Sequence, residues 1–309
     1  MENTCKVKIK LFGTGLLLSA VMLSSAQTKI QLPAKYRHFD MEAHRGGKGL
    51  MPENTIPAML RAIDMGITTL EMDMQVTKDG QIVVSHDATF NYGFTTTPEG
   101  DTLTPAEAKK RILYTMTYDS IKKYDVGQKF YAAVPRQKKM AAVKPLLKDL
   151  LTATEAYAKK KGVAIRYNIE IKSSVKGEGV YCPPVAGFTN LAMQTILPFN
   201  IGKRMIIQCF DERALKIMHA KYPQVQTSFL TGDKEKRSLD EQLKSLGYVP
   251  EYYSPHYSVV TPELVEACHE RHMKIVPWTA DDIAIIKSLA DMGADGVITD
   301  YPDLFYQLK

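Results

Sequence analysis

Eight short segments with the apolar or alternating pattern of β-strands recur along the sequence, and each is followed by a stretch with helical periodicity. The strand candidates are residues 39–44, 68–76, 167–172, 204–210, 225–230, 251–255, 274–279 and 296–300. Regular alternation of strands and helices predicts a parallel sheet that is covered by helices. Eight such units in about 280 residues match a (β/α)8 TIM barrel, so the predicted fold class is α/β.

The first 26 residues have the pattern of a secretory signal peptide. Lys6, Lys8 and Lys10 precede an apolar run over 11–23, and the small residues "SSAQ" follow. We expect cleavage after Ala26, a single domain over 27–309, and an exported protein that is periplasmic or secreted. The apolar run is shorter than the roughly 20 residues that span a bilayer, so no stable membrane anchor is expected. The alternative is an uncleaved N-terminal anchor.

Charge and cysteine content exclude several classes of protein. The net charge of +6 is spread along the chain and lacks the dense basic runs of nucleic-acid-binding surfaces. We therefore expect a small anionic substrate and no nucleic acid. Cys182, Cys209 and Cys268 remain after cleavage, and this odd, widely spaced set predicts neither a disulfide framework nor a zinc site. No feature of the sequence predicts an oligomeric state.

One long segment interrupts the strand and helix rhythm. After "QIVVSHD", which forms the hairpin partner of the second strand, residues 88–142 are polar and rich in threonine, lysine and tyrosine. Short helices are predicted near 105–112 and 118–124, and a regular helix over 144–162 follows. Loops of this length in compact domains are usually functional or form small subdomains. We interpret 88–142 as an insertion that caps the barrel, with a solvated excursion of no chemical role as the alternative.

Three carboxylates are predicted to point into the barrel. Alternate residues of a strand share a face, so Glu71 and Asp73 lie opposite the apolar Leu70, Met72 and Met74. By the same reasoning, Glu170 and Lys172 share the inner face of the strand 167–172. Such a set requires either a hard divalent cation, Ca²⁺ or Mg²⁺, or an ion network with lysine and arginine. Barrel enzymes carry their sites at the C-terminal strand ends, which favours the metal.

Two histidines are expected at the same end of the barrel. His44 closes the first strand, and His86 closes the hairpin strand. An unperturbed imidazole has a pKa of about 6.5, so each could serve as a general acid or a general base.

These motifs occur in an order that resembles a known family. The run "AHRGGKGLMPENT", followed by "AIDMGITTLEMDMQVTKDGQIVVSHD", is similar to the glycerophosphodiester phosphodiesterases. That family's pattern reads His-Arg-Gly, Pro-Glu-Asn-Thr, Glu-x-Asp, Thr-x-Asp-Gly and His-Asp. The segments "NIEIK", "QCF", "VPWTADD" and "GADGVITDYPD" are similar to its later strands, so the resemblance covers about residues 40–305.

The resemblance implies a role for each matching residue. It implies a barrel that hydrolyses glycerophosphodiesters to an alcohol and sn-glycerol 3-phosphate with one divalent metal ion. The implied roles are acid and base for His44 and His86, phosphate binding for Arg45 and Lys172, metal binding for Glu71, Asp73 and Glu170, and a possible substrate pocket for Glu53, Gln208 and Trp278.

The resemblance leaves the substrate and part of the mechanism open. We favour His44 as base, His86 as acid and the glycerol 2-hydroxyl as nucleophile, with direct attack by water as the alternative. Lys48, Asp281 and the long insertion depart from the family's usual pattern and bear on substrate preference. The rival functions are a related barrel phosphodiesterase acting on lysophospholipid, sphingolipid or phosphoinositide head groups, and a non-catalytic phosphodiester-binding protein.

Overall fold

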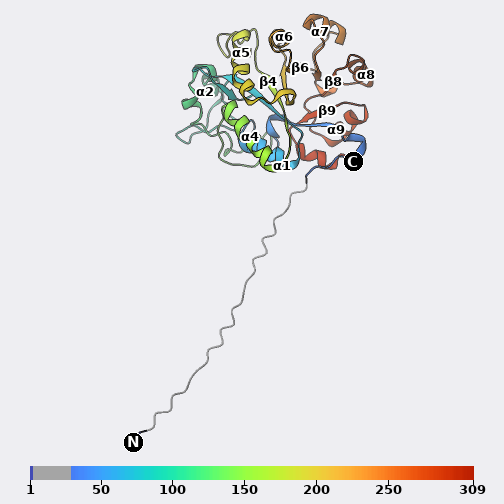
Figure 1. Ribbon diagram of the computed structural model, residues 1–309. Helices are drawn as coiled ribbons and strands as arrows, with labels where there is room; N and C mark the ends of the chain where they lie inside the picture. The colour runs from blue at the N-terminus through green and yellow to red at the C-terminus, as the bar shows by residue number, and fades with distance from the viewer. Residues whose placement is uncertain (3–28) are drawn as a thin grey trace.

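Parallel strands form the centre of the fold and helices surround them, as the computed structural model of residues 1–2 and 29–309 shows (Figure 1). The parallel strands are β1 (Asp40–Ala43), β2 (Thr69–Val76), β4 (Arg166–Ile171), β5 (Met205–Cys209), β6 (Gln226–Thr231), β7 (Tyr252–Pro255), β8 (Lys274–Ile275) and β9 (Gly296–Thr299). They lie in the order β8, β7, β6, β5, β4, β2, β1, β9. The amide of Ile298 donates to the carbonyl of Pro277 at 2.9 Å and joins the two ends of this row. The predicted (β/α)8 barrel is confirmed.

Helices follow the strands and begin and end at residues suited to these positions. Thr55 caps α1 by accepting a hydrogen bond from the amide of Ala58, and Gly66 ends it in a left-handed conformation. Ser238 and Glu241 form a reciprocal capping box at the start of α7. The helices of the barrel wall are α1 (Ile56–Met65), α4 (Leu147–Lys161), α5 (Val185–Ile196), α6 (Glu212–Lys221), α7 (Leu239–Leu246), α8 (Pro262–Glu270) and α9 (Ile283–Asp291).

Strand β2 shows how the sequence divides into an outer and an inner face. All of its residues are buried, and Leu70, Met72 and Met74 belong to the large apolar cluster between strands and helices. Its polar residues therefore lie on the opposite face, inside the barrel. Strand β4 pairs with β2 so that Glu170 lies beside Asp73. The predicted alternation thus places charged residues next to one another on neighbouring strands.

The strand predicted over 274–279 and the helix predicted over 144–162 are both shorter in the structure, and each is shortened beside a proline. The predicted strand over 274–279 is regular only at Lys274–Ile275, because Pro277 has no N–H to donate to the sheet. The predicted helix over 144–162 begins instead at Leu147. The carbonyl of Pro145 accepts a hydrogen bond from the amide of Val84 at 2.8 Å, which keeps the preceding residues extended beside β3 (Ile82–Val84).

The segment 88–142 packs around an apolar cluster of its own. This segment contains α2 (Pro105–Lys110) and α3 (Tyr118–Ile121), which are shorter than the helices predicted there. Phe90, Phe94, Leu113 and Ile121 are buried in the cluster. In Figure 1 the segment lies to one side of the strands, around α2. The role of this segment as a cap on the barrel stays a prediction.

The predicted signal peptide falls almost wholly on residues 3–28, outside the described residues. Among the helices of the described chain, none has the length and apolar character needed to cross a bilayer.

Candidate active site

The C-terminal strand ends surround a cavity of about 350 Å³, which we call the inner chamber. Its lining comes from most of the barrel strands and brings together residues that are far apart in the sequence. The polar and aromatic residues that line it include His44, Arg45, Lys48, Glu71, His86, Glu170, Lys172, Gln208, Phe210 and Trp278. Most of the predicted site residues therefore line one cavity. Asp73 and Glu53 are not among the lining residues, but each forms an ion pair with Arg45, which is.

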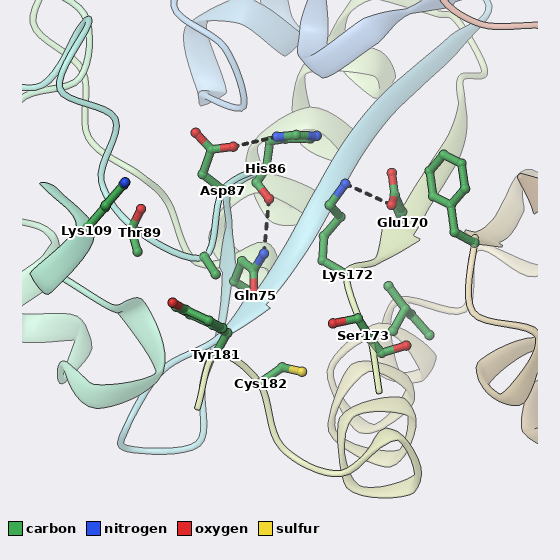
Figure 2. Close-up of a pocket in the computed structure, with 14 residues that line it drawn as sticks. Gln75, His86, Asp87, Thr89, Lys109, Glu170, Lys172, Ser173, Tyr181 and Cys182 are labelled. Atoms are coloured by element: carbon green, nitrogen blue, oxygen red, sulfur yellow. Dashed lines mark hydrogen bonds and ion pairs between the residues drawn. The ribbon is translucent and has the colours of Figure 1, made fainter. Parts of the chain in front are cut away.

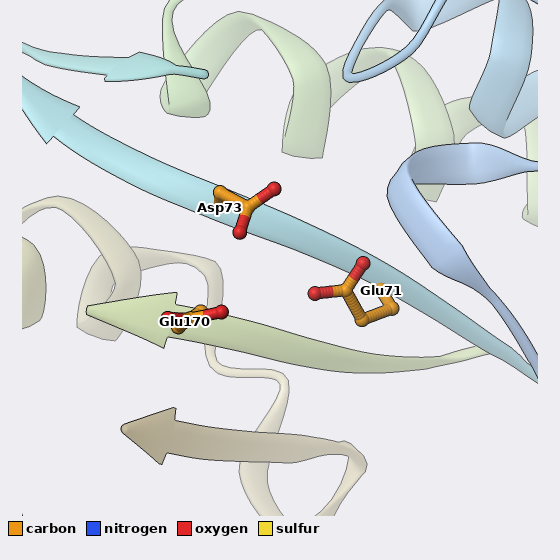
Figure 3. Close-up of side chains that lie close together, drawn as sticks. All are labelled: Glu71, Asp73 and Glu170. Atoms are coloured by element: carbon orange, nitrogen blue, oxygen red, sulfur yellow. The ribbon is translucent and has the colours of Figure 1, made fainter. Parts of the chain in front are cut away.

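Three carboxylates form a compact cluster beside this chamber. Glu71 and Asp73 project from β2, and Glu170 projects from the neighbouring β4 (Figure 3). One oxygen of each carboxylate lies within 4.8 Å of the others. Glu71 is 1% exposed, Asp73 0% and Glu170 7%. Burial and the proximity of Asp73 raise the pKa of Glu71 well above its ordinary value.

The carboxylate cluster fits a hard divalent cation. Its donors are all oxygen atoms, the type that Ca²⁺ and Mg²⁺ prefer. Asp73 Oδ1 is buried and has no hydrogen-bond partner among the described residues. A buried oxygen without a donor is costly, and a cation would satisfy it. The cluster could therefore hold a metal ion.

Lys172 and Arg45 place positive charge around the same carboxylates. Lys172 Nζ lies 2.9 Å from Glu170 Oε1 and 3.6 Å from Asp73 Oδ1. Burial alone would lower the pKa of Lys172, but Glu170 and Asp73 raise it above the ordinary value, so the lysine stays charged. Arg45 Nε lies 3.5 Å from Asp73 Oδ2. Both predicted phosphate-binding residues therefore border the carboxylate cluster.

The "HRGG" stretch turns sharply enough to point Arg45 inward. Arg45 has φ of 51°, and its amide donates to Glu71 Oε2 at 2.7 Å. The following Gly46 has φ of 78°, and a Cβ there would lie 2.8 Å from the Cβ of Ala58. Only glycine fits this left-handed position so close to α1.

The "PENT" stretch supports the same residues from behind. Glu53 Oε1 accepts a hydrogen bond from Arg45 Nη1 at 3.1 Å, so Glu53 orients the guanidinium. Asn54 Nδ2 donates to Asp73 Oδ2 at 2.8 Å, while Thr55 caps α1. Thr55 is thus the N-cap of α1, and the Asn54 side chain is used for the contact with Asp73.

His44 is held by a carboxylate from the last strand of the barrel. Its Nδ1 lies 2.5 Å from Asp300 Oδ1, and Lys48 Nζ lies 3.1 Å from Asp300 Oδ2. A neutral imidazole that donates from Nδ1 presents an unprotonated Nε2. Burial, together with the nearby Arg45, lowers the pKa of His44 to about 4. His44 is therefore neutral near pH 7, as a general base must be.

His86 has a carboxylate partner of its own. Its Nδ1 lies 2.7 Å from Asp87 Oδ1, and the Gln75 amide donates to the carbonyl of His86 at 3.1 Å (Figure 2). The hydrogen bond to His86 lowers the pKa of Asp87 below its ordinary value. The two histidines thus have equivalent support from different parts of the chain.

The two other predicted pocket residues also lie at the inner chamber. Gln208 Nε2 donates to Glu71 Oε1 at 2.8 Å, so it positions a carboxylate. Trp278 donates from Nε1 to the carbonyl of Ser254 at 3.0 Å, and its ring meets Phe210 edge to face at 5.5 Å between centroids. Both rings line the inner chamber and give it an apolar wall.

Several supporting residues were missed by the sequence analysis. Asp300 follows the last strand and holds His44, Asn54 bonds Asp73, and Asp87 bonds His86. Asp300 could have been found, because it stands at a C-terminal strand end like the other predicted residues. The partners of Asn54 and Asp87 follow only from the folded arrangement.

The fold and the site together define a class of protein, namely a TIM barrel with buried carboxylates and two supported histidines around one charged cavity. Comparison with known proteins is consistent with this class. The family model of the glycerophosphoryl diester phosphodiesterase family matches residues 44–304. The glycerophosphodiester phosphodiesterase of Bacillus altitudinis is 31% identical over 270 residues, which cover 86% of this chain and 96% of that protein.

Solved structures show the same fold. A Silicibacter pomeroyi protein of the glycerophosphoryl diester phosphodiesterase type superposes with a TM-score of 0.77 at 27% identity, covering 87% of this chain and 92% of that one. An Oleispira antarctica phosphodiesterase in complex with its product sn-glycerol-3-phosphate superposes with a TM-score of 0.67 at 19% identity, covering 90% and 95%. The chain belongs to the glycerophosphoryl diester phosphodiesterase family, and the enzyme class is that of the phosphoric diester hydrolases.

Proposed function

We propose that this enzyme hydrolyses glycerophosphodiesters to an alcohol and sn-glycerol 3-phosphate, with one divalent cation, Ca²⁺ or Mg²⁺, at Glu71, Asp73 and Glu170. The observation that carries the proposal is the arrangement around the inner chamber. Two histidines, each held by a carboxylate, and the positively charged side chains of Arg45 and Lys172 surround three buried carboxylates. The Oleispira antarctica phosphodiesterase, which has the same fold, was solved with its product sn-glycerol-3-phosphate, and this supports the choice of product.

Arg45 and Lys172 would bind the phosphate of the substrate. Both border the carboxylate cluster and line the inner chamber. The guanidinium offers two parallel N–H groups to two phosphate oxygens, and the ammonium adds a compact charge. A cation held by the carboxylates would further neutralise the phosphate oxygens.

The two histidines would move the protons of the reaction. His44, neutral with Nε2 available, removes the proton from the glycerol 2-hydroxyl, whose oxygen then attacks phosphorus. His86, when protonated, gives a proton to the oxygen of the departing alcohol. The resulting cyclic phosphate is opened by water with the roles of the histidines reversed. Direct attack by water on the diester remains the alternative order of events.

A substrate panel tests the proposal. The purified protein is assayed on glycerophosphoethanolamine, glycerophosphoglycerol and lysophosphatidylcholine with Ca²⁺, with Mg²⁺ and with chelator. We expect sn-glycerol 3-phosphate from the first two, dependence on the cation, and little release from the lysophospholipid. Preferred cleavage of lysophospholipid would move the enzyme to the rival substrate class. Tight binding without turnover of any diester would support a non-catalytic phosphodiester-binding protein.

The contact between Asp300 and His44 leads to a prediction for the Asp300→Asn variant. We expect Asp300→Asn to lower kcat by about 10²- to 10⁴-fold, because an amide can hold the imidazole in the wrong tautomer. Asp300 also contributes stability. Burial alone would raise its pKa, but His44 and Lys48 lower it below the ordinary value.

The pH dependence of this stability follows from the lowered pKa. Stabilisation by an ionised carboxylate of this kind is complete above the unfolded pKa of about 4 and is lost as the pH falls through the folded value. Urea unfolding of the wild type and Asp300→Asn should differ at pH 7, and the difference should shrink toward pH 3. Equal stability at pH 7 together with an unchanged kcat would contradict the assignment.

We also propose that the enzyme is exported to the periplasm or secreted. The proposal is supported by the charged, apolar and small-residue order of residues 1–26.

A further inference from the structure

A second cavity adjoins the inner chamber and has a different lining. This cavity, the outer chamber, has a volume of about 720 Å³. His86, Glu170, Lys172 and Phe210 line both cavities, so the two meet at these residues. The remaining lining of the outer chamber comes from the segment 88–142, from the end of β4 and the chain between β4 and α5, and from Gln75 and Asp87.

The junction of the two chambers suggests how a diester would lie. A phosphate bound by Lys172 beside the carboxylates has two ester arms that leave phosphorus in different directions. One arm would extend past His44 toward Trp278 in the inner chamber, and the other would pass His86 into the outer chamber. Under the proposed function His86 protonates the departing alcohol. The arm beside His86 is therefore the alcohol, and the outer chamber is where it would bind.

The outer chamber is lined by carboxylates that have partners and by one lysine that has no ion-pair partner among the described residues. Each of its two carboxylates already has a partner. Asp87 Oδ1 lies 2.7 Å from His86 Nδ1, and Glu170 Oε1 lies 2.9 Å from Lys172 Nζ. Lys109, on α2, also lines the chamber and has no ion-pair partner within residues 29–309. Figure 2 shows Lys109 across the pocket from Lys172. A ligand in the chamber would thus meet one available positive charge and no unpaired carboxylate.

The neutral groups of the chamber are suited to hydroxyl groups. Four hydroxyl-bearing side chains line it, from Thr89, Ser173, Ser174 and Tyr181. Gln75 is 3% exposed, and its Oε1 accepts no hydrogen bond from the described residues. A hydroxyl of the ligand could provide this missing donor. The volume lies within the range of pockets that enclose drug-sized ligands, so a cyclic polyol has room.

We propose that the outer chamber binds the departing alcohol and selects polyhydroxylated alcohols, neutral or carrying an anionic group, over quaternary ammonium alcohols. This inference rests on the proposed function and adds the substrate class. Lys109 provides the charge that an anionic group would meet, and the hydroxyl-bearing residues provide the polar contacts. A quaternary ammonium group would meet no unpaired carboxylate and would gain no hydrogen bond, so the rings of Tyr181 and Phe210 would be its only favourable contacts among the lining residues.

The test compares kcat/KM for three esters that share the glycerophosphate arm. These are glycerophosphoinositol 4-phosphate, glycerophosphoinositol and glycerophosphocholine, assayed with Ca²⁺ or Mg²⁺. We expect the wild type to prefer both inositol esters to the choline ester. Lys109→Gln should lower kcat/KM for the phosphorylated ester by roughly fivefold, as for the loss of an exposed charge contact, and leave the choline ester unchanged.

Lys110→Gln is the matched control. Lys110 is the neighbouring exposed lysine of α2 and does not line the chamber. We expect no change with any of the three esters. If the choline ester is the best substrate, or if Lys109→Gln affects all three esters equally or none, the assignment of the chamber is wrong and the proposed function stands. If the wild type cleaves none of them, the proposed function itself fails and the inference with it.

Discussion

Replacing either His44 or His86 with alanine should lower kcat for glycerophosphodiester hydrolysis by about 10²- to 10⁴-fold. Each imidazole lines the inner chamber, and each is oriented through Nδ1 by its own carboxylate, Asp300 or Asp87. Loss of either ring removes one of the two proton transfers that the proposed reaction requires. Steady-state assays on glycerophosphoethanolamine with saturating cation measure the effect.

The histidine prediction has a control in the same chain. His38 is exposed, and its ring accepts a hydrogen bond from Arg37. His38→Ala should keep wild-type kcat. Near wild-type activity in both His44→Ala and His86→Ala, with the control unchanged, would refute acid and base catalysis by this pair.

Replacing Asp73 with asparagine should reduce cation-dependent activity by at least about 10²-fold. A cation that neutralises a reacting phosphate contributes several kcal/mol to transition-state stabilisation, and Asp73 is one of the three carboxylates that would hold it. Loss of the charge should weaken cation binding, which isothermal titration calorimetry measures directly. Added Ca²⁺ or Mg²⁺ should raise the Tm of the wild type and not that of Asp73→Asn.

Glu42 provides the control for this second prediction. It is a fully buried carboxylate on β1 that accepts a hydrogen bond from Asn168 and lies outside the carboxylate cluster. Burial, together with the nearby Asp40, raises the pKa of Glu42 well above its ordinary value, so an uncharged amide is a mild replacement at this position. Glu42→Gln should then preserve both activity and cation binding. Full activity of the wild type in chelator would contradict the metal proposal.

Strand alternation made the carboxylate cluster predictable. Glu71 and Asp73 are two residues apart, so their shared direction follows from the local geometry of one strand. The C-terminal ends of parallel strands meet at one end of a barrel, which also placed His44 and Glu170 near them. The structure brings these residues to one place, while their roles in catalysis stay predictions.

Long-range pairings were not predictable in the same way. Asp300 holds His44 from a position 256 residues away, and this contact depends on closure of the barrel between β9 and β1. The hydrogen bond from the amide of Ile298 to the carbonyl of Pro277, which joins the two ends of the strand row, likewise connects segments that are apart in the sequence. Nothing local to either segment indicates which partner it meets.

The sequence by itself determined the eight-unit barrel, the inward carboxylates and the family, because periodicity and motif order are properties of neighbouring residues. Only the tertiary structure decided that Asn54 bonds Asp73 while Thr55 caps α1, and that His86 and Lys172 line both the inner and the outer chamber. The physical reason is that hydrogen bonds and electrostatic interactions act over a few ångströms in space. Residues distant in sequence reach that range only when the barrel closes.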